Sequence, residues 1–66
     1  MIRCNLAVLL AERHVKISSV SADTGISRTT LTSLYKNASK GVQLSTVDTL
    51  CRYLNVEVGD LFTLEN

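Results

Sequence analysis

The sequence predicts an all-α fold of four to five short helices, packed into one domain that spans residues 1–66. Apolar residues recur every three or four positions, which is the spacing of one face of a helix. Gly25 and Asn55 stand at the ends of two of the expected helices, where glycine and asparagine are common. The apolar stripes are Leu6, Leu9 and Leu10, then Leu31 and Leu34, and then Val47, Leu50, Cys51 and Leu54.

The first two helices are expected over about residues 6–13 and from residue 16 or 17 to residue 24. Asn5 precedes the first as a good N-cap, because its side-chain oxygen can accept from a free amide of the first turn. Gly25 ends the second, because glycine adopts the left-handed conformation at no steric cost. Before the first helix, Met1 and Ile2 either pack on the domain or pair as a stub of strand.

A third helix is expected over about residues 28–36, with Ser27 as its N-cap. Leu31 and Leu34 lie three positions apart and share its inner face. The outer face is polar and carries only positive charge, which suits a helix that enters the major groove of DNA. Its residues are Arg28, Thr29, Thr32, Ser33 and Lys36.

The remainder of the chain predicts a loop, a fourth helix over about residues 46–55, and one further turn over residues 57–62. Ser45 followed by Asp48 is a capping-box pattern at the start of the fourth helix. The apolar cluster Leu61, Phe62 and Leu64 either caps the core or contributes to a dimer interface, and the sequence does not decide between these alternatives.

Charge and motif content favour a binding protein over an enzyme. The net charge is only +1, but residues 24–47 hold three basic residues and no acidic one. No catalytic constellation, phosphate-binding loop or metal-type spacing is visible, so we expect no enzymatic activity, metal or cofactor. Without a signal peptide or an apolar run of about 18 residues, the expected location is cytoplasmic and away from membranes.

The pattern from residue 17 to residue 36 resembles the helix-turn-helix of phage Cro and lambda-type repressors, the XRE family. The similarity continues through residues 40–51 and 59–62, which are similar to the loop, fourth helix and closing turn of small members. One position departs from the family, because residue 17 is Ile where many members have a glutamine that contacts the DNA backbone. The matching motif residues are Val20, Ser21, Gly25, Ile26, Leu31 and Leu34.

The resemblance implies a lambda-repressor-like domain with its helix-turn-helix in the second and third helices, which regulates transcription by binding double-stranded DNA. We expect a repressor that binds a palindromic operator as a homodimer. The expected base contacts are Arg28, Thr29, Thr32 and Ser33. The expected contacts to the DNA backbone are Ser27, Lys36, Asn37, Ser39 and Lys40.

A protein-interaction role is the alternative. An antitoxin-like or adaptor module could use the same fold, with the C-terminal apolar cluster binding a partner protein. The low net charge and the absence of glutamine at position 17 favour this alternative slightly. A third alternative is that the chain is a fragment of a larger regulator. The initial methionine argues mildly against this alternative.

Overall fold

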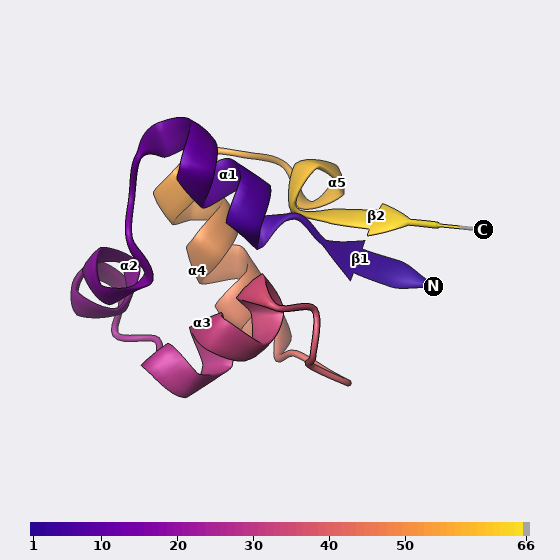
Figure 1. The fold of residues 1–66 in the computed structure, drawn as a ribbon, viewed down its shortest axis with the longest axis horizontal. Helices are drawn as coiled ribbons and strands as arrows, with labels where there is room; N and C mark the ends of the chain where they lie inside the picture. The colour runs from indigo at the N-terminus through magenta and orange to yellow at the C-terminus, as the bar shows by residue number, and fades with distance from the viewer. Residues whose placement is uncertain (66) are drawn as a thin grey trace.

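The structure, a computed structural model, describes residues 1–65. This part of the chain contains five helices and two short strands. Figure 1 shows the helices gathered around one core, with both termini in a strand pair that extends from one end. The elements, in chain order, are β1 (Ile2–Cys4), α1 (Leu6–Arg13), α2 (Ile17–Thr24), α3 (Arg28–Tyr35), α4 (Leu44–Leu54), α5 (Val58–Leu61) and β2 (Phe62–Leu64).

Each helix contributes one fully buried side chain to the core. Because large apolar side chains stabilise a fold by roughly 1.5–3 kcal/mol each when fully buried, these five residues hold the helices together. They are Leu6 of α1, Val20 of α2, Leu31 of α3, Leu50 of α4 and Leu61 of α5.

The apolar cluster near the C-terminus divides between the core and the surface. Leu61 is fully buried at the end of α5, so of the two alternatives it belongs to the core and not to a dimer interface. Phe62 is half-buried against the core, and Leu64 is 69% exposed. Only these last two residues of the cluster can contact another molecule.

The two ends of the chain form an antiparallel ribbon, which makes the all-α prediction incomplete. Ile2 pairs with Leu64 and Cys4 with Phe62. At its base the Asn5 amide donates to the Leu61 carbonyl over 2.7 Å. The Asn5 side chain donates to Thr63 Oγ1 over 2.8 Å and does not cap α1, so the capping role predicted for it is wrong.

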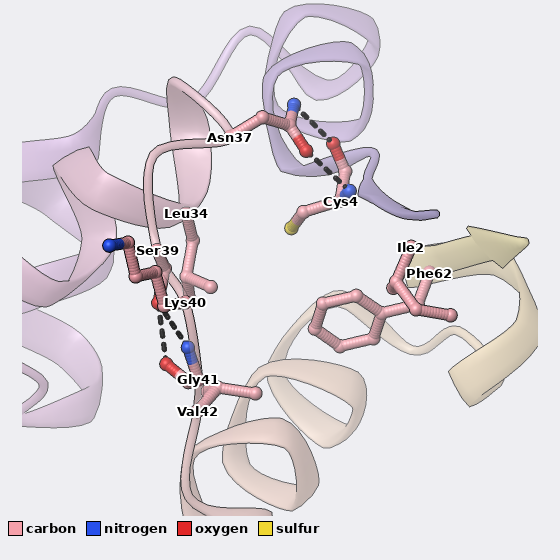
Figure 2. A pocket seen from close by; sticks show the side chains of 9 residues that line it. All are labelled: Ile2, Cys4, Leu34, Asn37, Ser39, Lys40, Gly41, Val42 and Phe62. Carbon is pink, nitrogen blue, oxygen red and sulfur yellow. Dashed lines mark hydrogen bonds between the residues drawn. The ribbon is translucent and has the colours of Figure 1, made fainter. Parts of the chain in front are cut away.

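Asn37 ties the end of α3 to the outer edge of this ribbon (Figure 2). Its φ of 57° is left-handed, a conformation that asparagine tolerates better than most residues. Its side-chain oxygen accepts the Cys4 amide over 2.7 Å, and its side-chain nitrogen donates to the Cys4 carbonyl over 3.1 Å. The side-chain amide of Asn37 therefore bonds to the free edge of β1 at Cys4, as the backbone of a third strand would.

Helix α4 begins at Leu44, earlier than predicted, and the capping box expected from Ser45 and Asp48 does not form. Gln43 is the N-cap residue, and its carbonyl accepts the amides of Thr46 and Val47. The predicted pair therefore lies inside the first turns of the helix. Asp48 instead accepts from Arg52 Nε over 2.9 Å, one helical turn further along.

Replacing Asn37 should destabilise the fold in a way that separates its hydrogen bonds from its backbone conformation. We expect Asn37→Gly, which keeps the left-handed conformation, to lower the free energy of unfolding by about 2 kcal/mol, because two hydrogen bonds are lost. Asn37→Ala should cost about 1–2 kcal/mol more, since alanine resists positive φ. Urea unfolding measures both. An unchanged stability of Asn37→Gly would show that the tie to Cys4 contributes nothing.

Candidate nucleic-acid interface

Side-chain hydrogen bonds hold the connection between α2 and α3. Gly25 ends α2 with a φ of 80°, as the sequence predicted. Thr24 Oγ1 donates to the Val20 carbonyl over 2.6 Å and accepts the Ile26 amide over 3.2 Å. Ser21 Oγ donates to the Ile26 carbonyl over 2.7 Å. These bonds fix the direction in which the chain enters α3.

From the sequence, Ser21 is expected only as a residue of the motif, and Thr24 has no expected role in the turn. Hydroxyl side chains just before a helix-ending glycine are the signal that could have revealed both bonds, because such side chains readily satisfy turn amides and carbonyls. The structure thus makes the turn a hydrogen-bonded unit, with the half-buried Ile26 packed against the core.

Ser27 caps α3 as predicted. Its hydroxyl oxygen accepts the Thr30 amide over 3.2 Å and donates its proton to Thr30 Oγ1 over 2.9 Å. This proton is therefore engaged within the protein, although Ser27 itself is exposed. The predicted contact from the Ser27 hydroxyl to the DNA backbone would require that bond to break.

Helix α3 presents an apolar face to the core and a polar face to the outside. It packs against α1 and α2 through Leu31 and Leu34, which are 0% and 3% exposed. Figure 1 shows α3 along one edge of the molecule. The predicted base-contact residues share the opposite side, where Arg28 and Thr29 are exposed and Thr32 and Ser33 are half-buried.

The positive charges around α3 are free to meet a ligand. Three ion pairs form among residues 1–65, and none of them includes Arg28, Lys36 or Lys40. All three side chains are exposed. Since no acidic residue lies between residues 24 and 47, this surface attracts anions even though the whole chain carries a net charge of only +1.

Two of the predicted contacts from the loop after α3 have other partners. Both polar atoms of the Asn37 side chain are bonded to the backbone of Cys4, so the predicted contact from Asn37 to the DNA backbone would compete with this tie to the ribbon. The Ser39 hydroxyl donates to the Gly41 carbonyl and accepts the Gly41 amide, which closes a tight turn. Of the three predicted loop residues, Lys40 is the one whose side chain makes no hydrogen bond or ion pair within residues 1–65.

Comparison with known proteins identifies the domain. The model of the Cro/C1-type helix-turn-helix DNA-binding domain matches residues 5–66. The chain belongs to this family. Among curated proteins it is 32% identical over 57 residues to the protein named uncharacterized HTH-type transcriptional regulator YozG of Bacillus subtilis, a match that covers 86% of this chain and 68% of the relative.

The fold of this Cro/C1-type domain also has a solved counterpart. A crystal structure from Bacteroides fragilis, of a protein described only provisionally as DNA-binding, superposes with a TM-score of 0.82. The match covers 96% of this chain and 100% of that chain at 24% sequence identity, so it shows a shared fold.

An apolar side chain stands at the start of α2, at the position where the resemblance leads one to expect glutamine. Ile17 is half-buried against the core and offers no polar group to a phosphate. At the other end of the helix, Tyr53 of α4 donates its hydroxyl proton to Asp23 over 2.6 Å, a bond that raises the pKa of Tyr53. This bond fastens α2, which supports α3, to α4.

Neither cysteine forms part of a site in the described chain. Cys4 and Cys51 are both free, and burial raises the pKa of each thiol, so both are protonated near neutral pH. No group of three or more potential metal ligands gathers among residues 1–65. None of the helices there is long and apolar enough to cross a membrane.

Replacing Gly25 tests the left-handed turn. A Cβ at this position would meet no atom within 4 Å, so any cost of Gly25→Ala comes from the backbone conformation. We expect Gly25→Ala to lower the free energy of unfolding by about 1–2 kcal/mol, and Gly25→Asn to cost less because asparagine tolerates positive φ. Equal stability of all three proteins in urea would contradict this assignment of the turn.

Proposed function

We propose that this Cro/C1-type domain is a sequence-specific transcription regulator in which α2 and α3 are the helix-turn-helix and α3 enters the major groove. We further propose that it acts in the cytoplasm as a repressor on a palindromic operator, as a homodimer and without catalysis. The relative from Bacillus subtilis, which is named as a transcriptional regulator, supports the role in transcription.

The observation that carries the proposal is the outer face of α3. It combines hydrogen-bonding side chains with unpaired cations, whereas the inner face anchors the helix through two buried leucines. A helix held by its back with a polar front is the element that the major groove admits. The bonded turn before it keeps the helix in a fixed orientation.

Arg28 is the residue best suited to read a base. It lies in the first turn of α3, is exposed, and carries a guanidinium fork that matches O6 and N7 of guanine. Thr29 offers an exposed hydroxyl and a methyl group for thymine, and the half-buried Thr32 and Ser33 offer further hydroxyls. Each of these short side chains discriminates weakly, so Arg28 should dominate the base preference.

Lys36 and Lys40 are the proposed phosphate contacts. Both ammonium groups are exposed, and they follow the recognition helix directly in the sequence. The backbone amides of Arg28 and Thr29, which precede the capped Thr30 amide, add donors at the N-terminal end of α3. Phosphate contacts position the protein without reading sequence.

A homodimer follows from the short length of the reading helix. Eight residues of α3 can contact only a few base pairs. Two copies on half-sites about 34 Å apart would double the contact and read a palindrome. A dimer bound in this way would obstruct other proteins on the same DNA, which is the basis for proposing a repressor.

An antitoxin-like or adaptor role is the second candidate. The exposed apolar residues at the chain ends favour it, since Ile2 is 62% and Leu64 is 69% exposed. If this candidate is correct, binding of the partner protein should be lost with Leu64→Gln. It should be retained in the double variant Arg28→Ala, Lys36→Ala. The DNA-binding proposal expects the double variant to lose function while it remains folded.

The proposed role of Arg28 is tested by selecting binding sites from a random duplex library and measuring affinities for the selected sites. We expect an enriched palindrome. Arg28→Ala should lose about 1–3 kcal/mol of binding free energy at one base position and relax the preference there. Lys36→Ala should weaken binding to all sequences alike and reduce the salt dependence by about one ion.

Arg52→Ala is the matched control, because it removes the same charge from an exposed side chain on α4 that is paired with Asp48. It should leave the base preference unchanged. Uniform weakening by Arg28→Ala would make this residue a phosphate contact and refute its reading role. A selection that enriches no sequence at all would refute sequence-specific binding.

A further inference from the structure

The terminal ribbon has one apolar face that is only half covered. Residues directly opposite each other and two apart along a strand share a face, so Ile2, Cys4, Phe62 and Leu64 lie together. We call these four residues the ribbon face. Its inner half is packed, because Cys4 is 6% exposed and Phe62 is half-buried. Its outer half, Ile2 and Leu64, is mostly exposed.

A groove of about 250 Å³ lies beside the ribbon face; most of its lining is apolar, and Lys40 is the charged residue that lines it. Figure 2 shows the Phe62 ring on one side of it and Leu34 and Val42 on the other. Val42 lies in the loop between α3 and α4 and is 36% exposed. The groove and the outer half of the ribbon face thus form one apolar surface at one end of the molecule.

The charged side chains of the ribbon, Arg3 and Glu65, are paired with each other, and Arg3 alternates with Ile2 and Cys4 and so lies on the opposite face. Arg3 Nη1 and Glu65 Oε1 are 3.5 Å apart, and the terminal ammonium of Met1 donates to the Glu65 carbonyl over 2.8 Å. The ribbon face itself carries no charged side chain. Two ribbon faces can therefore approach each other without charge repulsion between them, and Lys40, which lines the groove, is the cation that a symmetric contact has to leave in solvent.

We propose that the ribbon face and the adjoining groove form the contact between two copies of this chain. The exposed Ile2 and Leu64 of each copy cover the groove of the other around a two-fold axis. This inference rests on the proposed function, which needs two recognition helices, and it replaces the buried Leu61 with Ile2 as an interface residue.

The dimensions of the molecule support a second copy as the occupant. Its longest extent is 34 Å, and the ribbon lies at one end of that axis (Figure 1). Two copies that meet at their ribbon ends have centres separated by up to about one molecular length, which is close to the roughly 34 Å turn of B-DNA. A two-fold axis through the contact can leave both copies of α3 on the same side.

The contact is small, so the dimer should be weak in the absence of DNA. A standard interface covers about 800 Å² per partner. That area is about a sixth of the 4590 Å² that the whole chain exposes. Ile2 and Leu64 are the mostly exposed side chains that the contact covers, and Phe62 and Val42 add part of theirs. We expect a dissociation constant above about 1 μM.

The test is sedimentation of the full chain over a wide concentration range, without DNA. We expect a monomer–dimer equilibrium whose dissociation constant rises at least about ten-fold in Leu64→Gln and in Ile2→Gln, because each substitution changes both halves of a symmetric contact. Neither variant should unfold, since both side chains are mostly exposed in the monomer. Glutamine keeps the net charge, so DNA attraction is unaltered.

Val8→Gln is the control, because Val8 is 53% exposed on α1 and lies outside the ribbon face. It should leave the dissociation constant unchanged. A wild-type chain that stays monomeric up to about 1 mM, or equal weakening by Val8→Gln, would overturn the proposal.

Binding to one half-site and to the whole palindrome separates this proposal from the proposed function. We expect Leu64→Gln to retain half-site affinity and to lose at least about ten-fold on the palindrome, because the contact adds affinity only when both copies are bound. Equal palindrome affinity of Leu64→Gln and wild type would overturn the interface alone. A chain that self-associates through the ribbon but binds no selected DNA would refute the proposed function alone.

Discussion

The fold depends on left-handed residues that stop its helices. His14, Gly25 and Asn55 end α1, α2 and α4 with positive φ, and Asn37 follows α3 in the same conformation. A left-handed residue lets the chain leave a helix within one or two positions while its amide satisfies a terminal carbonyl. In so short a chain, these abrupt stops leave enough residues for five helices, each with a buried anchor in the core.

Hydrogen bonds within this short chain also determine which polar groups remain available on the surface around α3. Ser27, Asn37 and Ser39 are hydrogen-bonded within the protein, where they define a helix start, a tie to the ribbon and a loop turn. The free groups are the cations and the threonine and serine side chains of the outer helical face. Polar residues near a binding surface therefore divide by whether local backbone groups already satisfy them.

Periodicity predicted α1 and α2 within a residue, and residue type predicted the stops at Gly25 and Asn55. The family and the general location of the basic surface also followed from the sequence. The ribbon did not, beyond a possible stub, because three-residue strands show no periodicity and their partners lie about 60 positions apart. The tie from Asn37 to Cys4 depends on that long-range pairing, so the sequence could not predict it, and the sequence left Leu61 open between the core and an interface.

A weak contact at the chain ends has a consequence for regulation. If two monomers must meet on one operator, occupancy rises with the square of the monomer concentration while the free protein remains mostly monomeric. The DNA then supplies much of the free energy that brings the ribbons together, because binding at one half-site raises the effective concentration at the other. With a tight dimer, operator occupancy would rise less steeply with protein concentration. A small, uncharged ribbon face therefore suits a regulator whose DNA binding responds to its own concentration.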